Sequence, residues 1–208
     1  MDKPVIIIGA GGHAKVLMDS LRLQKVKVLG ALDKCSGQEV IEGLSILGDD
    51  RAIVKYSPNE VELVNGVGSV GDTSLRRGIF EKFKNLGYHF RSVIHPAAIV
   101  AEDCVLEEGV QVMAGAVVNT RTHIAEDTIV NTGTVIDHEC SIGSHVHIAP
   151  GVTISGGVQV GDCCHIGTGA TVIQCVSIGE QALVGAGTVV IDDVASGNKV
   201  VGVPARII

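Results

Sequence analysis

The sequence predicts a two-part α/β protein in which a βαβ unit is followed by a long parallel β-solenoid. Two patterns carry this prediction. An apolar residue recurs at every sixth position over the second half of the chain, and a glycine-rich turn near the start joins an apolar run to a helical pattern. The composition agrees, because 27 glycines suit many turns and a chain with 2% aromatic residues must fill its core with Val, Ile and Ala.

The six-residue repeat runs from Ile94 to Val190, and all seventeen positions in this column hold Ile, Val or Leu. A second column, two residues before the first, holds small or β-branched residues such as Thr128 and Val146. Such a period is typical of a β-solenoid, and we expect both columns to face its core. No six-residue unit carries an insertion, so the stack of coils should be regular.

The residue after the first column is often small or polar, as at Asn131, Gly143 and Gly167. We expect these positions to form the corners of the solenoid, where residues that tolerate positive φ are favoured.

The first strand is expected at residues 4–8 and the second at 25–33, with a helix between them. The intervening turn fits GxGxxA, and an acidic residue follows about 20 positions later, as a dinucleotide-binding fingerprint requires. We therefore predict a site for a phosphate-bearing nucleotide at the helix N-terminus. Its candidate residues are Gly9, Gly11, Gly12, His13 and Asp33. Two plainer interpretations stay open: the glycines could serve strand-to-helix packing, and His13 could simply begin the helix.

A third strand is expected within residues 61–71, and a helix within 72–87 that begins at Asp72 or Thr73 and stops at Gly87. This is only half of a full dinucleotide-binding fold, so the domain is half-Rossmann-like. The predicted division of the chain is a nucleotide-binding domain at 1–92, the solenoid at 93–191 and a capping tail at 192–208.

Charge and composition argue against several classes of protein. The net charge is −7, and an acidic chain repels a phosphate backbone, so we expect no nucleic-acid partner. No apolar stretch reaches the length of a membrane span, and Asp2 stands where a signal peptide would carry a basic residue. Six cysteines without a CxxC pair indicate reduced thiols, which favours the cytoplasm.

Six motifs together resemble the bacterial hexapeptide-repeat sugar acetyltransferases. The resemblance covers the whole chain and implies a left-handed parallel β-helix, acetyl-CoA as co-substrate, and a homotrimer with active sites between subunits. This family includes the N-acetyltransferases of nucleotide-linked bacillosamine, perosamine and viosamine, and it is related to the sialic-acid O-acetyltransferases. The motifs are IIIGAGGHA at 6–14, VIHPAA at 93–98, IVNTGTVIDHEC at 129–140, HIAPG at 147–151, VGAGTVV at 184–190 and VGVPAR at 201–206.

Acyl transfer to an amine needs a base to take the proton, and histidine is the natural base near neutral pH. His138 lies two residues past the inward column, so it should point outward, and Glu139 follows it. The resemblance makes His138 the general base and Glu139 its catalytic partner. From the residues alone, the interpretation that His138 is a surface histidine without a catalytic role stays open.

The resemblance places His147 near the thioester carbonyl of acetyl-CoA, as a contact rather than a base. His147 is half a coil from His138, so within one chain the two should lie on different sides, and a trimer could bring them together. Asn131 is expected to bind substrate or position the base. The alternative that it only forms a corner of the solenoid stays open. His165 lies one coil after His147, where it could line the acetyl-CoA site or be structural.

The remaining acetyl-CoA-binding candidates are Gly167 and Gly185, whose backbone N–H groups we expect to face the pantetheine amides, and Pro204 and Arg206 in the tail. Arg206 could meet a CoA phosphate or be a solvated residue of the tail.

The resulting prediction is an acetyl-CoA-dependent N-acetyltransferase that acts on a nucleotide-linked 4-amino-4,6-dideoxy sugar. The main alternative is O-acetylation of sialic acid or a related sugar. More distant alternatives are a zinc enzyme, a nicotinamide oxidoreductase and a non-catalytic scaffold. No metal is expected, because His138, His145 and His147 do not keep the spacing of a three-histidine zinc site.

Overall fold

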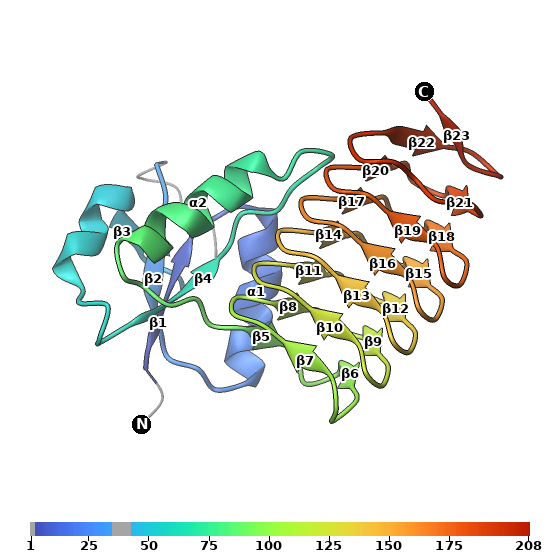
Figure 1. The fold of residues 1–208 in the computed structure, drawn as a ribbon. Coiled ribbons are helices and arrows are strands. Elements are labelled where there is room, and N and C mark those ends of the chain that lie inside the picture. Colours follow the sequence, from blue (N-terminus) through green and yellow to red (C-terminus); the bar gives the residue numbers. More distant parts are fainter. Residues whose placement is uncertain (1–2, 35–42) are drawn as a thin grey trace.

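The computed structural model describes residues 3–34 and 43–208 (Figure 1). A small α/β domain lies against the side of a tall stack of coils, and the chain ends at the far end of that stack. The coils form a left-handed parallel β-helix, so the fold class predicted from the sequence is confirmed. The domain boundaries at residues 92 and 191 stay predictions. No helix among the described residues is long and apolar enough to span a membrane.

The N-terminal sheet has four parallel strands in the order β3-β2-β1-β4. Every residue of the central strand β1 is buried, because helices and loops cover both faces of a parallel sheet. The strand expected within 61–71 is shorter than predicted, and the three-residue strand β3 was not foreseen because it is too short to show a pattern. The bounds are β1 (Val5–Ile8), β2 (Val28–Leu32), β3 (Ile46–Gly48) and β4 (Glu62–Asn65).

Two α-helices pack on this sheet, α1 (Gly12–Leu23) and α2 (Ser74–Asn85), together with a short 3-10 helix η1 (Asp50–Lys55). Of the two residues predicted to begin α2, Thr73 is the N-cap, but its side chain makes no capping bond, and Asp72 Oδ1 accepts from the Ser74 N–H at 2.8 Å instead. The helix ends at Asn85, and Gly87, the predicted stop, follows its C-cap: this glycine has φ +86°, and its N–H donates to the Lys84 carbonyl at 2.9 Å.

The β-helix consists of two-residue strands in three sheets, and each strand pairs in parallel with the strand one coil later, as His147 does with His165. The tail continues one of these sheets with β22 and folds back on it with β23. The bounds are β5 (Val93–Ile94), β6 (Ile99–Val100), β7 (Val105–Leu106), β8 (Gln111–Val112), β9 (Val117–Val118), β10 (His123–Ile124), β11 (Ile129–Val130), β12 (Val135–Ile136), β13 (Ser141–Ile142), β14 (His147–Ile148), β15 (Thr153–Ile154), β16 (Gln159–Val160), β17 (His165–Ile166), β18 (Thr171–Val172), β19 (Ser177–Ile178), β20 (Leu183–Val184), β21 (Val189–Val190), β22 (Lys199–Val201) and β23 (Arg206–Ile207).

Both predicted columns face the core of the β-helix, where Thr128, Val130, Val146 and Ile148 are all fully buried. The first coil is the exception, because no complete coil precedes it: Ile94 is 37% exposed, and Val100 and Leu106 are half-buried. The regular stack follows directly from a repeat without insertions.

The prediction that the residue after the inward column forms the positive-φ corner is wrong. Positive φ occurs two positions later, as at Glu139 (58°) and His145 (57°), and Asn131 does not adopt it. Glycine is needed after the column for a different reason, which Gly167 illustrates. A Cβ there would lie 2.6 Å from the Ala186 backbone nitrogen of the next coil, so glycine allows the coils to stack.

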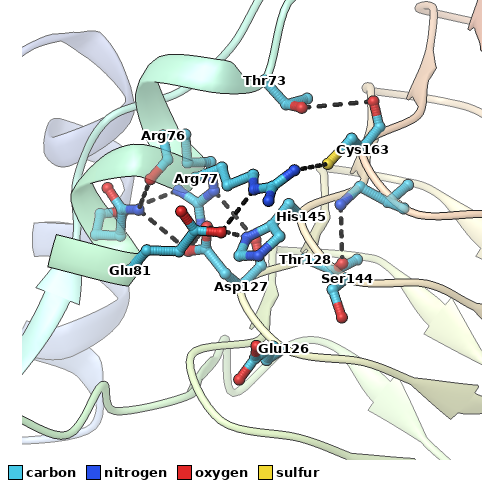
Figure 2. Close-up of polar contacts among 12 residues, drawn as sticks. Thr73, Arg76, Arg77, Glu81, Glu126, Asp127, Thr128, Ser144, His145 and Cys163 are labelled. Carbon is cyan, nitrogen blue, oxygen red and sulfur yellow. Dashed lines mark hydrogen bonds and ion pairs between the residues drawn. The ribbon is translucent and has the colours of Figure 1, made fainter. Parts of the chain in front are cut away.

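A buried ion pair joins the two parts of the chain (Figure 2). Arg76 of α2 and Asp127 of the β-helix are 1% and 0% exposed, and Nη2 lies 2.8 Å from Oδ1. Asn65 donates its amide to the same carboxylate at 3.1 Å, and His145 Nδ1 lies 3.0 Å from its other oxygen. Arg76 Nη1 also donates to the Val67 carbonyl at 2.8 Å. The guanidinium therefore ties both the β4–α2 loop and the β-helix to α2.

We predict that Arg76→Met lowers the free energy of unfolding by about 3–5 kcal/mol, because it leaves the Asp127 carboxylate buried without its partner. Urea unfolding at neutral pH would measure the loss. Arg77→Met is the matched control at the next position of the same helix. It removes an exposed pair with Glu81, whose side chains are 46% and 47% exposed, and a weak 3.7 Å contact with Cys163 Sγ, and should cost about 0.5 kcal/mol or less. Equal losses of unfolding free energy in the two variants would contradict the conclusion that the pair between Arg76 and Asp127 stabilises the protein.

Candidate active site

A cavity of about 410 Å³ lies where the N-terminal domain meets the β-helix. The start of α1, the β4–α2 loop and two coils of the β-helix each contribute residues to it. The cavity brings together His13, Asn131 and His147, which the sequence analysis had divided between the sugar and acetyl-CoA. Its lining consists of Gly12, His13, Val16, Gly68, Ser69, Val70, Asn131 and His147.

Buried Gln111 fixes the proton position on His13. The Gln111 amide nitrogen donates to the Asn65 carbonyl at 2.8 Å, so its oxygen is the atom that lies 2.7 Å from His13 Nε2. Nε2 therefore carries the proton, and Nδ1 is left as a hydrogen-bond acceptor. Burial, and secondarily the charge of Arg76, lowers the pKa of His13 to about 4. His13 is thus a neutral ring at neutral pH and accepts rather than donates at Nδ1.

His147 lies between Ser69 and Asn131. Its Nδ1 is 2.8 Å from Ser69 Oγ, and its Nε2 is 3.2 Å from Asn131 Nδ2. Burial, and secondarily the neighbouring rings of His165 and His13, lowers the pKa of His147 to about 3. A neutral ring with both nitrogens engaged is unsuited to act as a base, which supports the prediction that His147 is a contact.

The glycine turn has room for a ligand on one side only. Gly9 has φ +87°, and a Cβ there would lie 2.8 Å from Val67 Cγ2, so this position needs glycine for its backbone. Gly11 and Gly12 instead face open space, since no described atom lies within 4 Å of a Cβ built on either. Asp33 Oδ2 accepts from the Ala10 N–H at 2.8 Å, which joins the end of β2 to the turn.

His138 lies at an exposed corner between two sheets, outside this cavity. His138 and Glu139 are each 52% exposed, and His138 Nδ1 lies 3.2 Å from Glu139 Oε2. The other Glu139 oxygen lies 3.2 Å from an Arg121 nitrogen. The carboxylate favours the proton at Nδ1, which leaves a lone pair on Nε2 that can accept a proton. Gly156 makes space for the ring, because a Cβ there would be 2.7 Å from His138 Nε2.

His138 and His147 lie on different sides of the β-helix, as the sequence analysis expected. His147 belongs to β14, whereas His138 follows β12, and these strands lie in separate sheets. One chain therefore does not bring the two histidines into one site.

The expected role of Gly167 and Gly185 as exposed backbone donors is wrong. The Gly167 N–H donates to the Val184 carbonyl at 2.7 Å, and the Gly185 N–H donates to the Val200 carbonyl at 2.8 Å. Both groups are used in hydrogen bonds between coils. Arg206 is exposed in β23, where its Nη1 donates to the neighbouring Ala205 carbonyl at 2.7 Å.

His165 stacks edge-on against His147, with ring centroids 5.1 Å apart, and Pro204 lies exposed in the turn before β23. Within the described parts of the chain, no group of three or more His, Cys, Asp or Glu side chains could hold a metal ion.

The sequence analysis missed Gln111 and Ser69. Gln111 had a partial signal in the sequence. It occupies the same column of the same sheet as His147, two coils earlier, so the two polar side chains face the same side of the β-helix. Ser69 had none, since it lies in an irregular loop between β4 and α2.

The PglD N-terminal domain family model matches residues 4–83. Over its whole length the chain is similar to PerB from Caulobacter crescentus in complex with CoA and GDP-perosamine. The two are 37% identical, the alignment covers 100% of this chain and 98% of that chain, and the TM-score is 0.91. The chain belongs to the bacterial hexapeptide-repeat sugar acetyltransferases.

Two further relatives agree. The acetyltransferase domain of PglB from Neisseria gonorrhoeae FA1090, in complex with acetyl coenzyme A, is 31% identical to this acetyltransferase over 100% of both chains, with a TM-score of 0.93. UDP-N-acetylbacillosamine N-acetyltransferase from Bacillus subtilis (strain 168) is 35% identical over 119 residues, which is 54% of this chain and 52% of that protein. The match thus spans about half the length of the curated relative. The predicted family and enzyme class are confirmed.

We predict that the rings of His13 and His147 stay neutral at pH 5 in the folded acetyltransferase, because burial lowers both pKa values well below 6.5. The unfolded chain binds protons at these rings near pH 6.5, so the free energy of unfolding should fall as the pH drops from 6.5 toward 4. Nitrogen-15 NMR of the rings and urea unfolding across this range would measure both effects. The variant His147→Gln should show a smaller loss, whereas ring titration near pH 6.5 would contradict the prediction.

Proposed function

We propose that this acetyltransferase carries the acetyl group of acetyl-CoA to the amino group of a nucleotide-linked 4-amino-4,6-dideoxy sugar. The observation that carries the proposal is the similarity of this chain to PerB, whose structure holds both CoA and GDP-perosamine. The alignment covers 98% of the PerB chain. The glycine turn supports it, because Gly11 and Gly12 leave open space at the N-terminus of α1, where phosphate groups bind.

His138 acts as the general base in this proposal. Its Nε2 takes a proton from the sugar amine as the amine nitrogen bonds to the thioester carbonyl carbon. The carbon–sulfur bond then breaks, and the proton held by His138 passes, directly or through water, to the departing CoA thiolate, which leaves as the thiol. Glu139, 3.2 Å from His138 Nδ1, stabilises the imidazolium that forms in between.

The proposed active form is a homotrimer with its active sites between subunits. Two observations support it: His138 lies outside the cavity that holds His147, and the outer faces of the first coils carry exposed apolar side chains, Ile99 at 67% and Val105 at 55%. A neighbouring copy would cover such side chains and supply the missing half of a site. The five cysteines of the described residues are free, which supports a cytoplasmic location.

Acetyl-CoA is proposed to lie along the C-terminal coils, with His147 and His165 toward its reactive end. Gly167 and Gly185 would then let the pantetheine approach the coils closely, since their N–H groups are already used. Pro204 and the exposed Arg206 would lie toward the CoA phosphates, which a guanidinium binds well.

A screen tests the function. Acetyl-CoA is supplied with UDP-, dTDP- and GDP-linked 4-amino-4,6-dideoxy sugars, with the matching 4-hydroxy sugars and free sialic acid as controls, and thiol release is measured. Release with an amino sugar alone is the expected result. Release with only a hydroxyl acceptor would establish O-transfer instead, and no release with any acceptor would overturn the proposal.

We predict that His138→Ala lowers kcat by about 10²–10⁴-fold without loss of stability, as expected for an exposed general base. The matched control is His123→Ala. His123 is also an exposed β-helix histidine beside a glutamate, with Nε2 2.7 Å from Glu107 Oε1. Its replacement should leave kcat unchanged. Equal effects in the two variants, or full turnover without His138, would remove His138 from the mechanism.

We predict that Asp33→Asn raises KM for the nucleotide sugar about tenfold and leaves KM for acetyl-CoA within about twofold, since one charged hydrogen bond at the glycine turn is weakened. Steady-state kinetics with each substrate varied in turn would measure the difference. Equal changes in both KM values would contradict a nucleotide site at this turn.

A further inference from the structure

A chain of hydrogen bonds leads from the β-helix backbone into the cavity. It begins at the Thr132 N–H, which donates to Asn131 Oδ1 at 2.8 Å. A backbone N–H can only donate, so it fixes which end of the Asn131 amide is oxygen. The amide nitrogen Nδ2 is consequently the atom that faces His147 Nε2, at 3.2 Å.

The amide in turn fixes the proton on His147. Because Asn131 Nδ2 donates, His147 Nε2 must accept, and the single proton of a neutral ring lies on Nδ1. Nδ1 then donates to Ser69 Oγ, 2.8 Å away. The low pKa of His147, caused chiefly by burial, agrees with a neutral ring.

The Ser69 hydroxyl is left with one role. Its oxygen accepts from His147, so its own proton must be donated elsewhere. Within the described parts of the chain no hydrogen bond from the Ser69 hydroxyl to another group is formed, and Ser69 lines the cavity. A hydroxyl that cannot turn back toward His147 presents its proton to whatever the cavity binds.

The cavity favours an uncharged partner for this proton. None of its lining residues is charged at neutral pH, since His13 and His147 are neutral and the remaining side chains do not ionise. The nearby charge of Arg76 is buried in its pair with Asp127. A carboxylate or phosphate at Ser69 would find no exposed cation, whereas a carbonyl or hydroxyl oxygen needs none; the phosphates proposed at Gly11 and Gly12 would use the backbone N–H groups of α1 instead.

We infer that Ser69 is a substrate-binding residue whose hydroxyl donates a hydrogen bond to an uncharged carbonyl or hydroxyl oxygen, and that Asn131 and His147 position it. This inference rests on the proposed function for its choice of substrates. The oxygen belongs either to the acetyl group of acetyl-CoA or to the sugar. His13 Nδ1, an acceptor in the same cavity, would add a second bond for a sugar hydroxyl but none for a thioester carbonyl.

Kinetics of Ser69→Ala and Ser69→Thr test the donor. We expect Ser69→Ala to raise KM about tenfold for one co-substrate and leave the other within about twofold, and Ser69→Thr, which keeps the hydroxyl, to restore most of the loss. A higher KM for acetyl-CoA together with a lower kcat would identify the thioester carbonyl as the acceptor of the Ser69 hydrogen bond, because negative charge develops on that oxygen during the reaction. A change for the sugar alone assigns a hydroxyl. Unchanged constants in Ser69→Ala, or no recovery in Ser69→Thr, would overturn the inference.

Two measurements do not depend on turnover. Nitrogen-15 NMR of the wild-type protein should show His147 protonated at Nδ1 only, and a proton at Nε2 would overturn the positioning chain. Calorimetry of acetyl-CoA and CoA with wild type and Ser69→Ala separates the two sources: a tenfold weaker binding confined to acetyl-CoA assigns the acetyl carbonyl. Unchanged binding of both, together with unchanged binding of a nucleotide amino sugar, would overturn the donor role. If no amino sugar were acetylated, the proposed function would fail and these two measurements would still decide the role of Ser69.

Discussion

The buried pair between Arg76 and Asp127 holds the cavity together. The carbonyl of Asn65 accepts from both Arg76 and Gln111, and Gln111 in turn orients His13. The same guanidinium holds the Val67 carbonyl, two residues before Ser69. The residues that dock the N-terminal domain therefore also set the positions of His13 and the Ser69 loop. Burying an ion pair costs desolvation free energy. Its fixed geometry, however, allows the N-terminal domain to dock on the β-helix in one position only.

Much of the fold could be predicted because its determinants are local. A six-residue period specifies which side chains enter the core wherever the chain winds, so the inward columns were predicted without knowledge of any long-range contact. His138 and Glu139 were also within reach, since a contact between sequence neighbours needs no tertiary information. The contacts of Gln111 and Ser69 were not, because their partners His13 and His147 lie 98 and 78 residues away, and the repeat shows only that Gln111 shares a column with His147.

The corner prediction failed because glycine has two uses in this fold. Close stacking of coils selects glycine after the inward column, while the positive-φ corners hold several larger residues, among them Asp127, Glu139 and His145. Positive φ costs a non-glycine residue about 1 kcal/mol or more, so each such position needs compensation. Asp127 and His145 find it in the buried joint, and Glu139 in its contact with His138. These three corners thus hold residues that dock the domains or lie beside the proposed base, whereas other corners with positive φ, such as Cys175 and Gln181, do neither.

The two kinds of histidine in this protein suit different tasks because of where they lie. His13 and His147 are buried beside each other and beside Arg76, which keeps them neutral and makes them fixed donors and acceptors. A base has the opposite requirement, since it must gain a proton in each cycle and lose it before the next. His138, half exposed and next to a carboxylate, can pass that proton to water. The proposed binding in a neutral cavity and the proposed proton transfer at a solvated edge are therefore separated within one chain, which supports the proposal that a second copy completes the site.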